Sequence, residues 1–399
     1  MINKISNRAA SIVESATSGM ATTARQLKSR GIDVVNLSQG EPDFKTPDHV
    51  CQAAKVAVDS GKYFSYPPTA GYMDLREAIA EKYNRENNVS YKSDNVVVSN
   101  GAKQALSNVM LSILNAGDEV IIFAPYWVSY YAQVKLAEAT PVVVNGDAGN
   151  GFKVTADQLK QAITKKTRAI VFSSPSNPTG IVYSRAELSA FAAVVIAYPD
   201  VLVIADEIYE HINYTDERTS FASLPGMFER TATINGFGKC FAMTGWRVGY
   251  VAAPTWLSAE VTKLQGHLSS ANCSIAQRAA FAAVTGSISS TEIMVKEYRM
   301  RRDLVFGYLQ SIQDVKTVMP QGAFYFFPDL SRFYGCQFNG KEITNSNDMC
   351  SYILNEGHVA LVPGEAFGND SCVRISYAAS TEDLKKALSQ VTQALNKLR

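Results

Sequence analysis

The sequence VLVIADEIY at residues 201–209 decides the fold class, because five apolar residues, Val201–Ala205, end abruptly at Asp206. Continuous apolar runs separated by segments of helical period are typical of parallel strands that are covered on both faces. The stretch from Asn95 to about Val251 therefore predicts an α/β fold, with a mostly parallel central sheet flanked by helices. The comparable runs lie at residues 96–98, 119–123 and 169–172.

The C-terminal part of the chain has a different pattern. Residues 299–312 and 382–398 have helical periodicity, whereas residues 324–327 and 373–377 resemble antiparallel strands. This α+β pattern predicts a second, smaller domain. We expect three parts: an N-terminal segment (1–45) that packs with the small domain, a large domain (46–290) and the small C-terminal domain (291–399).

Composition excludes several classes of protein. Lys and Arg number 38 and Asp and Glu 37, so no basic field favours nucleic acid. The longest apolar run, Phe191–Tyr198, is far shorter than the roughly 18 residues of a membrane helix, and Met1–Gly19 lacks the apolar stretch of a signal peptide. The six cysteines show no disulfide or zinc-ligand spacing. We therefore expect a cytoplasmic protein without a metal site.

Polar motifs follow the predicted strands at the point where each strand ends. Gly101 lies in a strand-to-helix turn, where backbone N–H groups and the helix dipole can bind an anion, although many such glycines are there for steric reasons only. Asn177 stands between two prolines, which make either a rigid turn or a side chain fixed over a pocket. Ligands bind at this edge of open α/β sheets.

Asp206 at the end of a buried strand needs a cation or a donor to offset its desolvation. It either caps a following helix or pairs with a protonated heterocycle, and Tyr209 would share its face if a helix began here. Arg374 lies in an alternating strand pattern. It is either an outward-facing charge or a fork that binds a carboxylate.

Lys239 is surrounded by glycines and apolar residues in the segment 233–249. Desolvation there should lower the pKa of its amine, which suits a lysine that forms a Schiff base. The alternative is a solvated surface lysine, which these neighbours do not favour. Arg247 is the next charged residue, and its guanidinium could neutralise a phosphate.

Together these motifs make the chain resemble the class-I aminotransferases, which belong to fold type I of the pyridoxal-phosphate enzymes. The resemblance covers nearly the whole chain and includes the family's cofactor-attachment segment, Gly236–Gly249. Two blocks, PYWVSY (125–130) and AMTGWR (242–247), are most similar to the bacterial aspartate aminotransferase subgroup. The other matching motifs, in the family's order, are GEPDF (40–44), YPPTAG (66–71), PYW (125–127), PSNPTG (175–180) and DEIY (206–209).

The resemblance implies that pyridoxal 5′-phosphate is bound to Lys239 as a Schiff base and that Lys239 then shuttles a proton. It implies that Asp206 keeps the pyridine nitrogen protonated, so that the ring acts as an electron sink. The small domain of this family closes over the substrate. The other implied cofactor contacts are Tyr209 and Asn177 to the ring O3′, Trp127 to the ring face, and Gly101, Ala102, Arg247 and the neighbouring Lys103 around the phosphate.

For the substrates, an amino acid and a 2-oxo acid, the resemblance assigns Arg374 and Gly40 to the α-carboxylate, beside Asn177 and Trp127. It also implies a homodimer, in which Tyr66 reaches the phosphate of the neighbouring subunit. One departure is Gly236, where many relatives carry a serine that binds the phosphate.

Substrate choice depends on a cation for the second carboxylate of aspartate. The context of Arg278 does not match that of the arginine used by the best-known aspartate enzymes. In the bacterial subgroup a lysine after the phosphate turn does this, and Lys103 stands at that position. We therefore expect amino transfer from L-aspartate to 2-oxoglutarate. The alternatives are aromatic, prephenate or alanine transamination, a pyridoxal-phosphate-dependent lyase, and a ligand-sensing regulator on the same fold.

Overall fold

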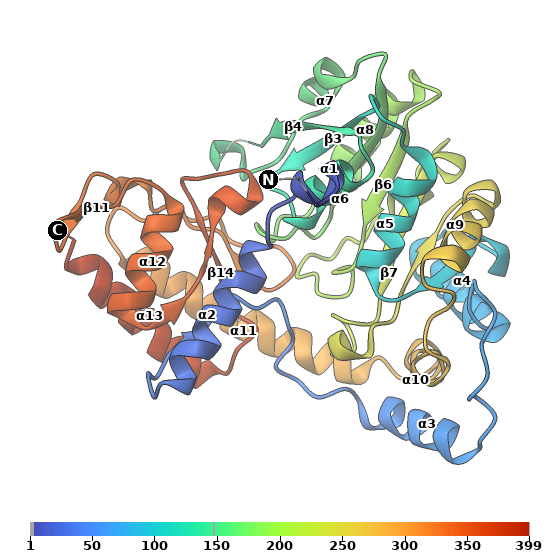
Figure 1. The fold of residues 1–399 in the computed structure, drawn as a ribbon, viewed down its shortest axis with the longest axis horizontal. Coiled ribbons are helices and arrows are strands. Elements are labelled where there is room, and N and C mark those ends of the chain that lie inside the picture. The colour runs from blue at the N-terminus through green and yellow to red at the C-terminus, as the bar shows by residue number, and fades with distance from the viewer. Residues whose placement is uncertain (1–3, 147, 399) are drawn as a thin grey trace.

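The computed structural model describes residues 4–146 and 148–398 (Figure 1). Its main strands are β2 (Val96–Ser99), β3 (Glu119–Ala124), β4 (Thr140–Asn145), β5 (Thr167–Ser173), β6 (Leu202–Asp206), β7 (Thr231–Gly236) and β8 (Gly249–Ala252). Within the described residues they form one sheet in the order β2-β8-β7-β6-β5-β3-β4. Only β8 runs antiparallel to its neighbours. The α/β fold predicted from the apolar runs is therefore confirmed.

Helices cover both faces of this sheet because successive side chains along each strand point to opposite sides. Ile121 packs on one face and Ile122 on the other, which explains why the strands are apolar throughout. The face with Ile122 is covered by α5 (Ala102–Ile113), α6 (Ser129–Leu136) and α9 (Thr255–Leu268). The opposite face is covered by α7 (Ala156–Ala162) and α8 (Arg185–Ile196), and by α3 (Asp48–Asp59), α4 (Met73–Asn87) and α10 (Ser274–Thr285) near β2 and β8.

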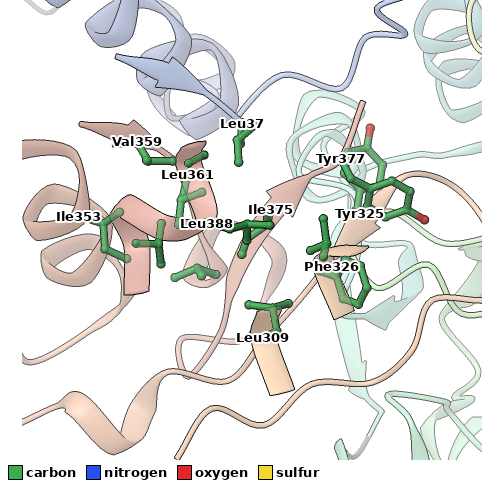
Figure 2. Close-up of a cluster of buried hydrophobic side chains, with 14 of the residues drawn as sticks. Leu37, Leu309, Tyr325, Phe326, Ile353, Val359, Leu361, Ile375, Tyr377 and Leu388 are labelled. Atoms are coloured by element: carbon green, nitrogen blue, oxygen red, sulfur yellow. The ribbon is translucent and has the colours of Figure 1, made fainter. Parts of the chain in front are cut away.

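The C-terminal elements gather beside the main sheet, in orange and red in Figure 1. Their antiparallel sheet has the order β13-β14-β9, and Figure 2 shows the apolar cluster around it. No helix in the described part of the chain is long and apolar enough to cross a membrane. The strands are β9 (Tyr325–Phe326), β13 (Val362–Pro363) and β14 (Val373–Ser376), and the helices are α11 (Ser289–Ser311), α12 (Ser346–Gly357) and α13 (Thr381–Asn396).

The N-terminal segment lies against these C-terminal elements. Its strand β1 (Val35–Asn36) pairs in parallel with β12 (Val359–Ala360), and its helix α2 (Ala16–Ser29) contacts β12 and β13. These contacts support the three-part division of the chain, which stays a prediction. Apart from short 3-10 helices, the other elements are α1 (Asn7–Ala10), β10 (Gln337–Phe338) and β11 (Lys341–Glu342).

Helix α11 begins ten residues before the start predicted at Arg299. Its buried stripe explains the difference, because Met294 and Tyr298 continue the same face as Val305 and Leu309. The helix also reaches the N-terminal segment, since Arg301 donates to an oxygen of Asp43 at 2.7 Å.

We predict that Leu309→Ala destabilises the protein by about 2–5 kcal/mol, because Leu309 is 1% exposed and its truncation leaves a cavity. Met300→Ala, on the exposed side of the same helix, should cost less than about 0.5 kcal/mol. Urea unfolding followed by far-ultraviolet circular dichroism measures both. Equal midpoints for the two variants would contradict the assignment of this helix face to the core.

Candidate active site

A cavity of about 650 Å³ opens at the carboxyl ends of β2, β5, β6 and β7, the edge at which open α/β sheets bind ligands. Of the residues that the resemblance assigns to the cofactor or the substrates, Tyr66 alone among the described ones lies outside its lining. The others come together there from segments far apart in the chain. They are Gly40, Gly101, Ala102, Lys103, Trp127, Asn177, Asp206, Tyr209, Lys239, Arg247 and Arg374.

Lys239 lies in the turn that follows β7, with its amine inside the cavity. The Nζ atom donates a hydrogen bond to the backbone oxygen of Gly40. Burial lowers the pKa of Lys239 to about 8, and the nearby charges of Arg374 and Arg247 act in the same direction, whereas Glu41 and Asp206 oppose them. A fraction of this amine is therefore neutral near pH 7, which a nucleophilic lysine requires.

Asp206 is the last residue of β6 and is 5% exposed. Its Oδ2 accepts a hydrogen bond from the Tyr130 hydroxyl at 2.7 Å, and its Oδ1 accepts from the Ile208 backbone N–H at 3.2 Å. Burial raises the pKa of Asp206 to about 6, while both hydrogen bonds and the charge of Lys239 lower it. The carboxylate is thus held ready for a cationic partner in the cavity. Sequence reasoning missed Tyr130, which lies on α6.

Tyr209 reaches the cavity from a turn, not from a helix. Residues 208–211 form a turn after β6. No helix begins at this point, so Asp206 does not cap one. Backbone hydrogen bonds close the turn, from Glu210 to Glu207 and from Ile212 to Tyr209. The Tyr209 hydroxyl lies 2.8 Å from that of Tyr325, a second cavity residue that sequence reasoning missed.

Gly101 and Arg247 form one end of the cavity, at the N-terminus of α5. Gly101 has φ +83°, and a Cβ atom there would lie 2.5 Å from an Arg247 Nη atom. The Arg247 guanidinium donates to the backbone oxygens of Thr244 and Asn100. Gly249 lets β8 approach the helix start, because a Cβ atom would lie 2.2 Å from the Ala102 nitrogen. A guanidinium beside the first N–H groups of a helix suits a phosphate.

Gly236, the departure noted in the sequence, has a steric explanation. A Cβ atom at this position would lie 2.8 Å from the Cα atom of Gly249 and 3.0 Å from the backbone oxygen of Val248. The residue also lies outside the lining of the cavity, whereas Gly238 and Thr244 belong to it. In this chain a serine at position 236 would therefore push β7 and β8 apart.

Arg374 is 1% exposed, so the outward-facing interpretation of its strand pattern is wrong. Strand β14 is covered on both faces, and alternation of side chains cannot reveal that. One Nη atom donates to Asn177 Oδ1 at 3.0 Å and the other to the backbone oxygen of Ser38 at 2.6 Å. Its Nε has no hydrogen-bond partner, and no carboxylate of the described residues pairs with it. This buried cation suits a carboxylate ligand.

Lys103 places its amine 5.0 Å from the centre of the Trp127 ring. Partial burial and the charge of Arg247 lower the pKa of Lys103. The N-terminal segment also lines this part of the cavity, with Ser15, Thr17 and Arg25 among its residues. Sequence reasoning missed these side chains, because it placed the segment with the small domain and no local motif pointed to the cavity.

Two further residues lie elsewhere. Arg278 forms a two-point ion pair with Asp74 through distances of 2.6 and 2.8 Å, outside the cavity. Tyr66 is 91% exposed, and Phe64 and Leu268 are exposed as well. Nothing in the described part of the chain covers Tyr66.

The arrangement suits a small aromatic cation that carries a phosphate. Asp206 supplies a buried carboxylate at one end, Arg247 and the start of α5 supply an anion site at the other, and the Lys239 amine lies among them. Trp127 adds an aromatic wall. The unpartnered Nε of buried Arg374 indicates, in addition, a site for a carboxylate. These donors and acceptors fit pyridoxal 5′-phosphate and an amino acid.

Comparison with known proteins agrees with this geometry. Residues 32–391 match the family model described as aminotransferase class I and II. A bifunctional aspartate aminotransferase and glutamate/aspartate-prephenate aminotransferase from Petunia hybrida is 46% identical, over 98% of this chain and 82% of that protein. The structure of an aspartate aminotransferase from Rhizobium meliloti superimposes with a TM-score of 0.95 at 40% identity, over 99% of this chain and 100% of that one.

A further similar structure is an aspartate aminotransferase from Thermus thermophilus with maleate. It gives a TM-score of 0.93 at 38% identity, over 98% of this chain and 100% of that one. The family model and these full-length relatives confirm the resemblance seen in the sequence. The chain belongs to the class I and II aminotransferases, and it is a pyridoxal-phosphate-dependent enzyme of fold type I.

Proposed function

We propose that this aminotransferase moves the amino group of L-aspartate to 2-oxoglutarate. The observation that carries the proposal is the distribution of cations in the cavity. Arg247 lies at the anion site beside α5; among the other lining cations, which include Arg25 of the N-terminal segment, we assign Arg374 and Lys103 to the substrate. Two substrate cations suit a dicarboxylic amino acid, whose charged groups each need a charge-assisted hydrogen bond.

Pyridoxal 5′-phosphate, when bound, supplies an electron sink for the carbanion at the substrate Cα. Lys239 would hold the cofactor through its amine, and the same amine would then carry the proton that leaves the substrate Cα. Its lowered pKa supports this role, because the amine must be neutral to accept the proton. Asp206 would keep a proton on the ring nitrogen, and Tyr130 orients Asp206 by donating to its Oδ2.

The other contacts orient the reacting groups. Tyr209 would donate to the ring O3′, and so would the amide N–H of Asn177, whose oxygen already accepts from Arg374. Gly101, Ala102 and Arg247 would hold the phosphate, and Trp127 would pack on the ring. Three further residues, Arg374, Gly40 and Lys103, bind the substrate carboxylates.

Relatives support the choice of substrate. The Thermus thermophilus enzyme is an aspartate aminotransferase with maleate, a four-carbon dicarboxylate of the size of aspartate. The Petunia hybrida relative also acts on prephenate, which likewise carries two carboxylates. Prephenate is therefore our second candidate amino acceptor. It would use the same two cations, Arg374 and Lys103.

We also propose a homodimer in which Tyr66 completes the phosphate site of the partner. Its exposed fraction of 91% supports this, since a tyrosine so exposed, with the exposed Phe64 two residues before it, favours a protein contact. The six free cysteines, three of them buried, support a reducing compartment such as the cytoplasm.

We predict that L-aspartate bleaches the visible absorption band of the purified holoenzyme and that 2-oxoglutarate restores it, because the amino group first moves to the cofactor and then to the acceptor. Lys239→Ala should lower turnover by orders of magnitude, since it removes both the attachment point and the proton carrier. Spectrophotometry and a coupled oxaloacetate assay measure the two effects. The proposal fails if no amino acid bleaches the band.

Lys103→Ala should lower kcat/KM for L-aspartate by roughly 10- to 100-fold, the value of one charge-assisted hydrogen bond. For L-alanine, which lacks the second carboxylate, kcat/KM should change less than about two-fold. Lys263→Ala, an exposed lysine on α9, is the matched control. An equal loss of kcat/KM for aspartate and for alanine would mean that Lys103 does not bind the second carboxylate.

Affinity for pyridoxal phosphate should fall as the pH drops through about 6, because protonation of Asp206 removes the charge that pairs with the ring nitrogen. Tyr130→Phe removes a donor that lowers the pKa of Asp206, so in this variant the fall should begin at higher pH. Fluorescence titration of the apoenzyme across a pH series measures it. Tyr131→Phe, exposed on the same helix, is the control, and an identical pH profile in both variants would exclude this role of Tyr130.

A further inference from the structure

Two buried tyrosine hydroxyls meet beside the cavity. Tyr209 is 3% exposed and Tyr325 is 1% exposed, and their hydroxyl oxygens are 2.8 Å apart. The rings stand edge to face, with centres 5.9 Å apart and planes at 86°. Either hydroxyl can be the donor in this pair. Tyr325 lines the cavity, although none of the roles described above uses it.

Strand pairing fixes the position of Tyr325. It lies opposite Ser376 in the antiparallel pair of β9 and β14, so Arg374, two residues before Ser376, shares its face. The Arg374 guanidinium carbon lies 4.6 Å from the centre of the Tyr325 ring, within the range of a cation–π contact. In Figure 2 the hydroxyl oxygens of Tyr325 and Tyr377 point away from the aliphatic side chains of the cluster.

Gly40 shows how closely the Tyr325 hydroxyl is packed. A Cβ atom on residue 40 would lie 2.4 Å from that oxygen, so the backbone approaches the hydroxyl directly. The backbone oxygen of the same glycine accepts the hydrogen bond from Lys239. The Tyr325 side chain therefore touches three parts of the site: Tyr209, Arg374 and the loop at Gly40.

The number of protons decides the direction of the hydrogen bond. Burial raises the pKa of Tyr209 and of Tyr325, so each remains a neutral hydroxyl with one proton to donate. The charged groups that face the pair are Asp206 and Arg374, together with Glu41 beside Tyr325 and the Lys239 amine, 5.9 Å from the centre of the Tyr209 ring. If Tyr209 donates to the cofactor, it can only accept from Tyr325.

We propose that Tyr325 is a positioning residue of the aminotransferase site: its hydroxyl donates to Tyr209 and thereby directs the Tyr209 proton toward the cofactor O3′. This proposal rests on the role proposed for Tyr209. The ring of Tyr325 also supports Arg374 from one side. Removal of the hydroxyl alone separates the two contributions, because phenylalanine keeps the ring.

Tyr325→Phe in the holoenzyme should raise the pH midpoint of the cofactor absorption change by about half a pH unit. A donor to O3′ favours its ionised form, and a hydrogen-bond chain strengthens each bond by about 10–30%. The loss of Tyr325 therefore lets the bound chromophore keep its proton to higher pH. We expect kcat to fall several-fold while KM for aspartate changes less than two-fold. An unchanged midpoint would overturn the proposal.

The matched control is Tyr377→Phe. Tyr377 is a buried tyrosine next to β14 whose hydroxyl donates to another tyrosine, Tyr214, at 3.1 Å, and it lies outside the cavity lining. Its variant should leave the midpoint unchanged. An equal shift in Tyr377→Phe would mean that any lost hydroxyl in this core perturbs the site, which contradicts a specific role for Tyr325.

The double variant tests the connection between the two hydroxyls. Tyr209→Phe should raise the midpoint by more than Tyr325→Phe, and addition of Tyr325→Phe to it should cause no further shift, because the acceptor is gone. Additive shifts of the midpoint would overturn the proposed hydrogen bond from Tyr325 to Tyr209. An unchanged midpoint in Tyr209→Phe would overturn both the role of Tyr209 at O3′ and that of Tyr325. The reaction with aspartate is read independently, from bleaching of the band in the unsubstituted enzyme.

Discussion

The buried guanidinium of Arg374, which no carboxylate in the described part of the chain neutralises, is the constraint on which the site depends. Backbone and amide oxygens solvate it only partly, and its Nε has no partner. Lys239 and Arg247 add positive charge to the same cavity, against the carboxylate of Asp206. A cavity built in this way is incomplete without anions. Bound phosphate and carboxylate groups offset the cost of desolvating these cations, so ligand binding also neutralises the buried positive charge of the site.

The polar groups of the site follow the apolar strands, so they reach the cavity without interrupting the hydrophobic core. Strands β2, β5, β6 and β7 end where the sheet edge meets the cavity. Asp206 lies opposite Ile234 in the pairing of β6 and β7, and the loop to Lys239 follows β7 directly. Close backbone approaches then bring the loops together. Gly249 permits the approach of β8 to the start of α5, and Gly101 makes room for the guanidinium of Arg247.

Much of this was predictable from the sequence, because the apolar runs fix the strands and the motifs after them carry the chemistry. The rest depends on contacts between distant segments. Tyr130 meets Asp206 across 76 residues, and Tyr209 meets Tyr325 across 116, and no local pattern encodes either pairing. Burial of Arg374 was ambiguous for a related reason, since an alternating strand looks the same whether one face or both are covered.

Helix α11 connects these parts mechanically. Its 23 residues span about 34 Å. Near its middle, Arg301 donates a hydrogen bond to Asp43. Asp43 is three residues from Gly40, whose backbone oxygen accepts the hydrogen bond from Lys239. A continuous helix of this length transmits a tilt with little bending. A rotation of about 5° about the C-terminal end would displace Arg301, about 15 Å away along the helix, by about 1 Å. Helix α11 therefore connects the C-terminal elements to Asp43 through Arg301. A small tilt of those elements would shift the loop that contains Gly40 and, with it, the acceptor of the Lys239 hydrogen bond.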